Sequence, residues 1–128
     1  MAGKLTNEGE AHILNTYLKG VTRGTLYLGL YTDAVEPSEA ATLATITEAA
    51  IARIIINNAD VTVLNDLATI AQKTFTAAAA LGNVTGYFIC NISTGTWGTL
   101  IFVEHFSDGP YNVAAGESIR ITPSFLAA

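Results

Sequence analysis

The sequence contains little charge, a single cysteine and no long apolar run, and each shortage excludes a class of protein. Charged residues make up 13% of the 128, and 11 acidic side chains outnumber 6 basic ones, so the chain lacks the basic stripe that binds nucleic acids or anionic membranes. The lone Cys90 excludes an internal disulfide. The most apolar stretch, residues 49–56, contains Arg53 and is much shorter than the roughly 18 residues of a membrane span. We expect a soluble protein with neither nucleic acid nor membrane as its partner.

Signatures of catalysis and of metal binding are missing too. His12 and His105 are far apart in the sequence, and neither has a second histidine or a cysteine at ligand spacing. The acidic residues of segment 32–50 lack the spacing of a calcium-binding loop. Cys90 has apolar neighbours, which predicts a small buried thiol instead of a nucleophile, and His105 is predicted to be a half-buried strand residue. We therefore expect no enzyme, no cofactor and no metal site.

The first twenty residues carry the only helical pattern. Asn7 and Glu10 have the spacing of a capping box, and apolar residues then recur at helical intervals until Gly20, which can end a helix. These features predict one short amphipathic α-helix at about 7–19, within an N-terminal arm of residues 1–20.

After Gly24 the hydrophobic period changes to two. In segment 25–32 three leucines alternate with tyrosine, glycine and threonine, the pattern of a strand with one face against a core. Alternation, or a high content of β-branched and aromatic residues, predicts further strands at 53–57, 60–64, 72–77, 85–92, 99–106 and 118–122. Short strands separated by turn residues predict an all-β fold. We expect a single domain, 1–128, in which residues 25–125 form an antiparallel, jelly-roll-like β-sandwich.

Segment 32–50 interrupts the strand pattern. It has no strong period and is too long for a tight turn, so we expect an extended or partly helical loop that reaches outside the core. A helical turn at 38–43 is equally consistent with the residues. Together with the N-terminal helix, this loop is a candidate for contacts with a partner.

Aromatic residues supply the remaining candidates for binding. Tyr27 and Tyr31 fall on the strand face opposite the leucines, where they form either a stacking platform for a sugar ring or a surface buried by another chain. The contact with another chain is favoured, because no polar cluster around them suggests sugar hydrogen bonds. Trp97 is predicted to be a hairpin-edge residue packed on its neighbours, with a partner contact as the alternative. The residues expected at an interface are Leu14, Tyr17, Leu18, Tyr27, Tyr31, Val35, Pro37, Trp97 and Tyr111.

Several segments match a known group of proteins. They are LTN (5–7) before a short helix, LYLGLYT (26–32) before an acidic loop with Pro37, QKTFT (72–76), VTGYF (84–88), GTLIFVEHFSDGPY (98–111) and AGESIRITP (115–123). With these segments the chain resembles small structural proteins of tailed bacteriophages, of the capsid decoration (cement) type. Residues 49–69 take no part in the resemblance.

The resemblance implies a virion protein with a jelly-roll-like β-sandwich. Such a protein binds the major capsid protein on the outer surface of the head as a homo-oligomer, with a trimer favoured, and is present in the host cytoplasm during assembly. An acidic chain fits an exterior position, because packed DNA inside the head would repel it.

Two alternatives remain. Some relatives of similar pattern are described as tail or tail-fibre proteins, so the alternative within virions is a tail or baseplate structural protein or one that contacts the host. From another class, a small carbohydrate-binding β-sandwich is also consistent with the residues, and it would stack sugars on Tyr27, Tyr31, Trp97 and Tyr111.

Overall fold

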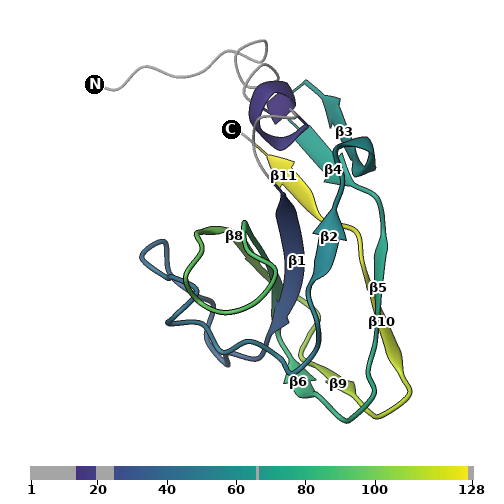
Figure 1. The fold of residues 1–128 in the computed structure, drawn as a ribbon. Coiled ribbons are helices and arrows are strands. Elements are labelled where there is room, and N and C mark those ends of the chain that lie inside the picture. The colour runs from purple at the N-terminus through teal and green to yellow at the C-terminus, as the bar shows by residue number, and fades with distance from the viewer. Residues whose placement is uncertain (1–13, 20–24, 66, 127–128) are drawn as a thin grey trace. The chain divides into compact units, whose positions relative to one another are not determined.

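The computed structural model describes residues 14–19, 25–65 and 67–126, and within them the chain is mostly antiparallel β-sheet (Figure 1). The strands are β1 (Leu26–Tyr31), β2 (Ile54–Ile56), β3 (Val61–Leu64), β4 (Leu67–Ile70), β5 (Lys73–Thr76), β6 (Gly82–Val84), β7 (Gly86–Cys90), β8 (Leu100–His105), β9 (Tyr111–Val113), β10 (Ser118–Ile121) and β11 (Ser124–Leu126). Every strand that the sequence predicted has a counterpart among them. The prediction of a mainly antiparallel β fold is therefore confirmed.

The predicted N-terminal helix falls mostly outside the described residues. Of positions 7–19, the structure describes only 14–19, in which one π-helical turn, η1 (Leu14–Leu18), is closed by the N–H of Lys19 donating to the carbonyl of Leu14 over 3.2 Å. This bond spans five residues, so the turn is wider than that of the predicted α-helix. The second short helix is a 3₁₀ turn, η3 (Asn58–Asp60).

Contacts divide the described chain into two compact units, each assembled from segments that are far apart in the sequence. One contains residues 14–19, 56–65, 67–73 and 121–126, and the other contains residues 25–55 and 74–120. The expectation of a single domain stays a prediction.

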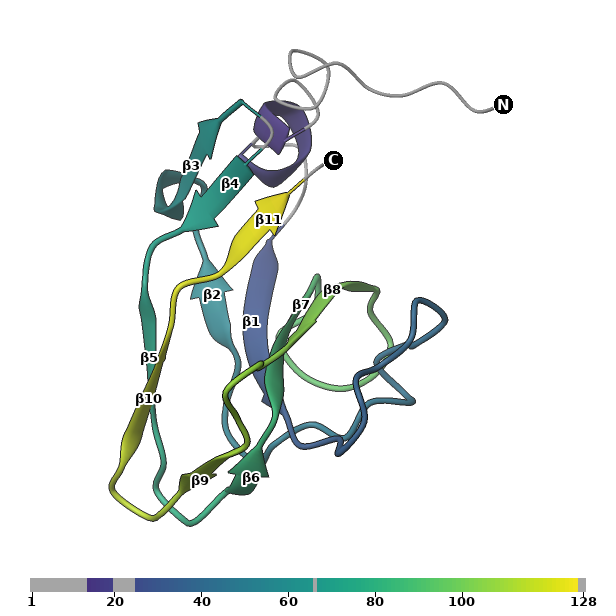
Figure 2. The same ribbon diagram turned by 180° about the vertical axis from the view of Figure 1, so that it is seen from behind.

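The first unit is built on a three-stranded sheet in the order β11-β4-β3, visible in Figures 1 and 2. Strands β3 and β4 form a hairpin in which Leu64 pairs with Leu67, and Asn65 in the turn has a left-handed φ of 55°, a conformation that asparagine tolerates better than most residues. The Asp60 carboxylate accepts hydrogen bonds from the backbone N–H of Asn57 and from Lys73, both over 2.8 Å. These bonds fix the 3₁₀ turn at the start of β3.

The second unit is built on a four-stranded sheet in the order β2-β1-β7-β8. In the ladder between β1 and β7, Gly29 pairs with Phe88 and Tyr31 pairs with Gly86. A side chain at Gly29 would collide with the Phe88 ring, and one at Gly86 would collide with the Tyr31 ring. Each aromatic ring therefore lies over the glycine of the neighbouring strand, an arrangement that fills the space left by the missing side chain.

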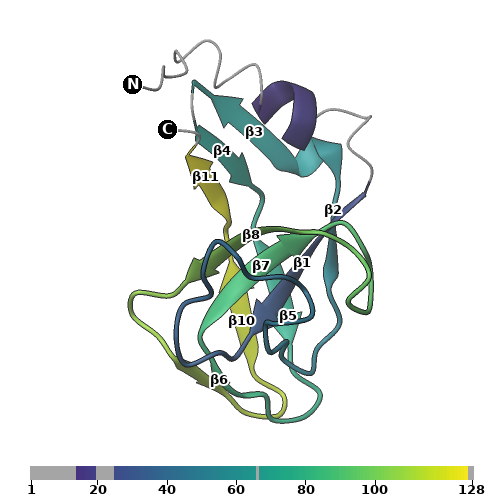
Figure 3. The same cartoon turned by 90° about the vertical axis from the view of Figure 1, so that its left-hand side faces the viewer.

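The loop of residues 32–50 folds back over this aromatic face, where it crosses in front of β7 in Figure 3. The N–H of Thr32 donates to the carbonyl of Thr47 over 2.9 Å within the loop, and the N–H of Ala49 donates to the carbonyl of Leu30 in β1 over 2.8 Å. Leu43 is buried in a cluster with Tyr31, Phe88 and Cys90. The expectation that the loop reaches outside the core is therefore wrong for its central part, which covers the sheet. At 38–43 the chain forms turns, with the N–H of Ala41 donating to Ser38.

Four strands were not predicted, and each has only three or four residues. They are β4, β6, β9 and β11. The predicted strand at 118–122 was ended at Pro123, which cannot donate to a ladder. Its carbonyl nevertheless accepts the N–H of Ile70 over 2.9 Å, and β11 begins at the next residue beside β4. The proline thus marks a change of sheet instead of the end of pairing.

Candidate interaction site

The connection between β7 and β8, residues 91–99, forms a loop with a fixed base and an exposed tip. Trp97 is 95% exposed, the highest value among the large hydrophobic residues that the structure describes. At the base, the N–H of Thr99 donates to the side-chain oxygen of Asn91 over 2.6 Å, and a side chain at Gly98 would collide with Asn91 and Ile92. Gly95 has a φ of 81°, which side chains rarely permit. The loop therefore closes on itself while the indole projects into solvent.

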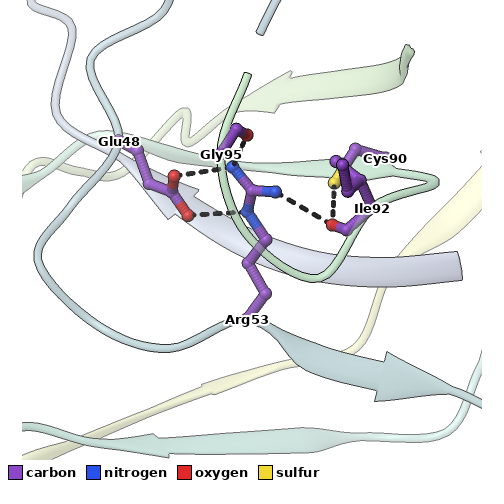
Figure 4. A network of polar contacts seen from close by, with 5 residues as sticks. All are labelled: Glu48, Arg53, Cys90, Ile92 and Gly95. Carbon is purple, nitrogen blue, oxygen red and sulfur yellow. Dashed lines mark hydrogen bonds and ion pairs between the residues drawn. The ribbon is translucent and has the colours of Figure 1, made fainter. Parts of the chain in front are cut away.

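Arg53 holds this loop from the interior of the unit (Figure 4). Its side chain is only 2% exposed, and its Nη1 and Nη2 atoms donate to the carbonyls of Ile92 and Gly95, each over 2.9 Å. The Nε and Nη2 atoms also donate to the two carboxylate oxygens of Glu48, over 2.8 and 2.7 Å. The guanidinium lies 5.3 Å from the centre of the Phe88 ring, close enough for a cation–π contact. One buried side chain thus joins three parts of the chain: the 32–50 loop, β7 and the 91–99 loop.

The electrostatics of this cluster are those of a structural pair. The bidentate hydrogen bond to Glu48 raises the pKa of Arg53, and burial works in the opposite direction. Because Arg53 donates hydrogen bonds to a carboxylate and to two carbonyls, few of its N–H groups remain to bind an anion from solution. Burial raises the pKa of the Cys90 thiol, whose Sγ lies 3.2 Å from the same Ile92 carbonyl that Arg53 binds. The prediction of a buried, unreactive thiol at Cys90 is confirmed as to burial.

A hollow of about 410 Å³ lies beside the Arg53 cluster. Residues 48–53 line one side of it, and Ser93, Thr94 and Gly95 of the Trp97 loop line the other. Apart from Glu48 and Arg53, which neutralise one another, its lining carries no charged side chain. The loop therefore presents a projecting indole and also forms one wall of an almost uncharged depression.

Comparison with known protein families, with curated proteins and with solved structures finds no match for this chain. Its function must be argued from the site. Among the described residues, no group of three or more histidine, cysteine, aspartate or glutamate side chains is placed to hold a metal ion. No helix in the described part of the chain has the length and apolarity to cross a membrane.

Tyr31 and Leu14 do not present the surface that was predicted for them. Tyr31 is completely buried, its hydroxyl lies 3.2 Å from Nδ1 of His105, and the two rings stack at 5.9 Å. Burial, followed by the nearby Glu36 carboxylate, raises its pKa well above the ordinary value for tyrosine. Leu14 is buried in η1. These two residues are therefore not available to another chain, and a sugar platform that includes Tyr31 is excluded. His105 is half-buried on β8, as predicted.

The other predicted interface residues are scattered over the described chain. Tyr27 is half-buried and packs against the Tyr31 cluster. Val35, 79% exposed, and the half-buried Pro37 lie together at a hollow of about 300 Å³ in the 32–50 loop. Tyr111 is partly exposed, with its ring 5.2 Å from that of Phe106, and Tyr17 is exposed on η1. The side chain of Leu18 lies outside the described residues.

The exposure of Trp97 differs from the main prediction for this residue. It was expected to pack on neighbours, but the loop base holds the backbone in a turn that leaves the indole nearly free of contacts. The alternative prediction, a partner contact, fits this exposure.

Sequence reasoning missed Arg53 and Glu48 as members of the site. One signal could have found them, namely a single arginine within the apolar stretch 49–56. Charged residues are almost never buried unless they are paired, so an arginine in such a stretch indicates a buried ion pair. Nothing in the sequence identifies Glu48 as its partner. A further pair, Leu64 and Leu67, was also missed; both are exposed at the turn between β3 and β4.

Proposed function

We propose that this protein is a structural component of a virion, a capsid decoration protein that binds the major capsid protein on the outer surface of a bacteriophage head and stabilises the shell. In this proposal the sheets form a jelly-roll-like β-sandwich, and the protein acts as a homo-oligomer with a trimer favoured. The observation that carries the proposal is the exposed Trp97 on a loop whose base is held by a buried arginine.

An exposed tryptophan on a fixed loop has the properties of a binding anchor. Tryptophan is among the residues that contribute most to protein interfaces, and it buries roughly 150–250 Å² of surface. At about 25 cal/mol per Å², full burial of the Trp97 indole contributes at most about 4–6 kcal/mol to binding. Because the loop is already ordered, little of this free energy is lost in fixing its backbone. These properties support a protein that binds a larger assembly.

The charge of the chain supports an exterior position on a head. Its formal net charge is -5, which packed DNA on the inside of the shell would repel. A protein that binds the closed shell and not the free capsid subunit stabilises the closed state by mass action. No chemical step is needed for this function.

Cosedimentation tests the proposal. The purified protein is mixed with undecorated heads and, separately, with isolated tails of the bacteriophage that encodes it. We expect saturable binding to heads at a fixed ratio, a marked loss of binding for Trp97→Ala, and unchanged binding for Leu64→Ala, which removes another exposed apolar side chain, 71% exposed, from the first unit. Binding to tails alone would support the tail or baseplate alternative, and binding to neither particle would overturn the proposal.

A second function, carbohydrate binding, is favoured by one observation. Trp97 shares its loop with hydroxyl side chains at Ser93, Thr94, Thr96 and Thr99, and no charged residue lies between 91 and 99. An exposed aromatic ring among hydroxyl groups is able to stack on a sugar. Binding on a glycan array that is lost in Trp97→Ala, without binding to heads, would favour this function over decoration.

A further inference from the structure

The Trp97 loop, residues 91–99, has the composition of a flexible segment, yet a side chain from another part of the chain, Arg53, bonds to its backbone. Two glycines and four small hydroxyl residues occupy positions 91–99, a composition that permits many backbone conformations. The carbonyls of Ile92 and Gly95 both accept hydrogen bonds from the buried guanidinium of Arg53. Arg53 is therefore the side chain from outside the loop that, together with Asn91 within it, holds one of those conformations.

Glu48 in turn fixes the direction of the guanidinium. Its two carboxylate oxygens accept hydrogen bonds from Nε and Nη2 along one edge of the planar guanidinium, which fixes the orientation of that plane. In this orientation Nη1 and Nη2 also donate to the loop carbonyls (Figure 4). A lysine could not reproduce this arrangement, because a single ammonium lacks the planar fork.

We propose that Arg53 is a positioning residue for partner binding, and that the Arg53–Glu48 pair holds the 91–99 loop in the conformation that presents Trp97 to an uncharged recess on a protein partner. The recess belongs to the partner named under the proposed function, and this part of the inference rests on that function. The ordering of the loop by Arg53 is a property of the free protein and can be tested without the partner.

The chemistry of the recess follows from what the loop presents. Residues 91–99 carry no charge, Arg53 is buried, and the Glu48 carboxylate is neutralised by it. A partner surface that fits them is apolar where it receives the indole and polar but uncharged where it meets the hydroxyl groups. Since no exposed charge pairs take part, the affinity should change little between low and high salt.

Fluorescence of Trp97 provides the test, because the chain has a single tryptophan. In the free wild-type protein we expect overall tumbling together with a limited fast component from rotation of the exposed indole about its own side-chain bonds. In Arg53→Lys we expect a larger fast component and, in the head-binding assay, an affinity that is about 10-fold weaker, since loop ordering then accompanies binding. Arg120→Lys, at an exposed arginine on β10, is the matched control and should leave both quantities unchanged. Glu48→Gln is the second variant if Arg53→Lys does not fold, because the amide keeps the shape of the glutamate and one acceptor oxygen for Arg53, at a side chain that is 33% exposed.

The outcomes separate this inference from the proposed function. If folded Arg53→Lys and Glu48→Gln keep the wild-type anisotropy decay and affinity while Trp97→Ala loses binding, Arg53 is not a positioning residue and the proposed function still stands. If the fast component grows but the wild-type protein binds no heads, the loop is positioned as inferred and the proposed partner is wrong. A strong dependence of head binding on salt would overturn the uncharged recess.

Discussion

Replacing Leu43 by alanine tests whether the 32–50 loop is part of the hydrophobic core. Leu43 is buried in a cluster with Tyr31, Phe88 and Cys90, although it lies in a segment without regular secondary structure. Substitution of a buried leucine by alanine typically costs about 2–5 kcal/mol, the larger values arising where the site cannot collapse. A loop can settle more easily than a strand, so we expect a loss of roughly 2–3 kcal/mol in the free energy of unfolding.

Val35→Ala is the matched control, because it removes methyl groups from the same loop at a position that is 79% exposed. An exposed substitution of this kind changes stability by less than about 0.5 kcal/mol. Urea unfolding followed by far-ultraviolet circular dichroism measures both variants. Tryptophan emission is a poor probe here, since Trp97 is already exposed in the folded protein.

With a urea m-value of about 1.5 kcal/mol per M, the expected loss moves the midpoint of Leu43→Ala down by roughly 1.3–2 M. The midpoint of Val35→Ala should stay within about 0.3 M of the wild type. Equal shifts in the two variants would refute the reasoning, because they would mean that the loop does not close the aromatic face of the sheet. A change in m-value for Leu43→Ala alone would indicate that the loop detaches before the rest of the protein unfolds.

Three further predictions concern packing, pH and thiol access. Gly29→Ala should lower the free energy of unfolding by about 1–3 kcal/mol in thermal melts, because a side chain there meets the Phe88 ring, and adding Phe88→Leu should recover part of the loss. The hydrogen bond from Lys73 lowers the pKa of Asp60 in the folded protein. The ionised Asp60 carboxylate therefore stabilises the fold above the ordinary aspartate pKa, and this contribution is lost as the pH falls through the lowered pKa of the folded state. Asp60→Asn should remove that part of the acid dependence of the free energy of unfolding. Cys90 should react with a thiol reagent only at the rate of unfolding, because it is buried and its pKa is raised; rapid reaction of the native protein would show that the aromatic face is open.

The strands that were predicted correctly are those whose local pattern is strong. Three leucines in alternation identify β1, and β-branched and aromatic residues identify β7 and β8. In contrast, β6 and β9 have three residues each and pair with one another across 26 residues or more of sequence, so little local pattern marks them. Pairing of this kind depends on tertiary contacts that no window of the sequence contains.

The same limit explains the mistaken prediction for Tyr31. Alternation along β1 correctly separates two faces of the strand, but it does not say what covers the second face. That face is covered by Leu43, which lies 12 positions further on in a loop with no period of its own. Trp97 shows the converse case. Its neighbours predicted a hairpin, but the bonds that Arg53 donates and the bond that Asn91 accepts hold a loop in which the indole is exposed.

Burial of the aromatic face of β1 removes one of the two surfaces on which a binding function could rest. Tyr31 is buried within the unit, so in the proposed function the larger share of the binding free energy falls on Trp97. A contribution of at most about 4–6 kcal/mol corresponds to a dissociation constant of roughly 0.05–1 mM, even before the cost of association is counted. A single loop of this kind would bind weakly and dissociate readily. If the protein binds a head as proposed, stable attachment requires several loops displayed together, so that the second and third bind at a high effective concentration; this is the physical reason for proposing a homo-oligomer on a repetitive surface.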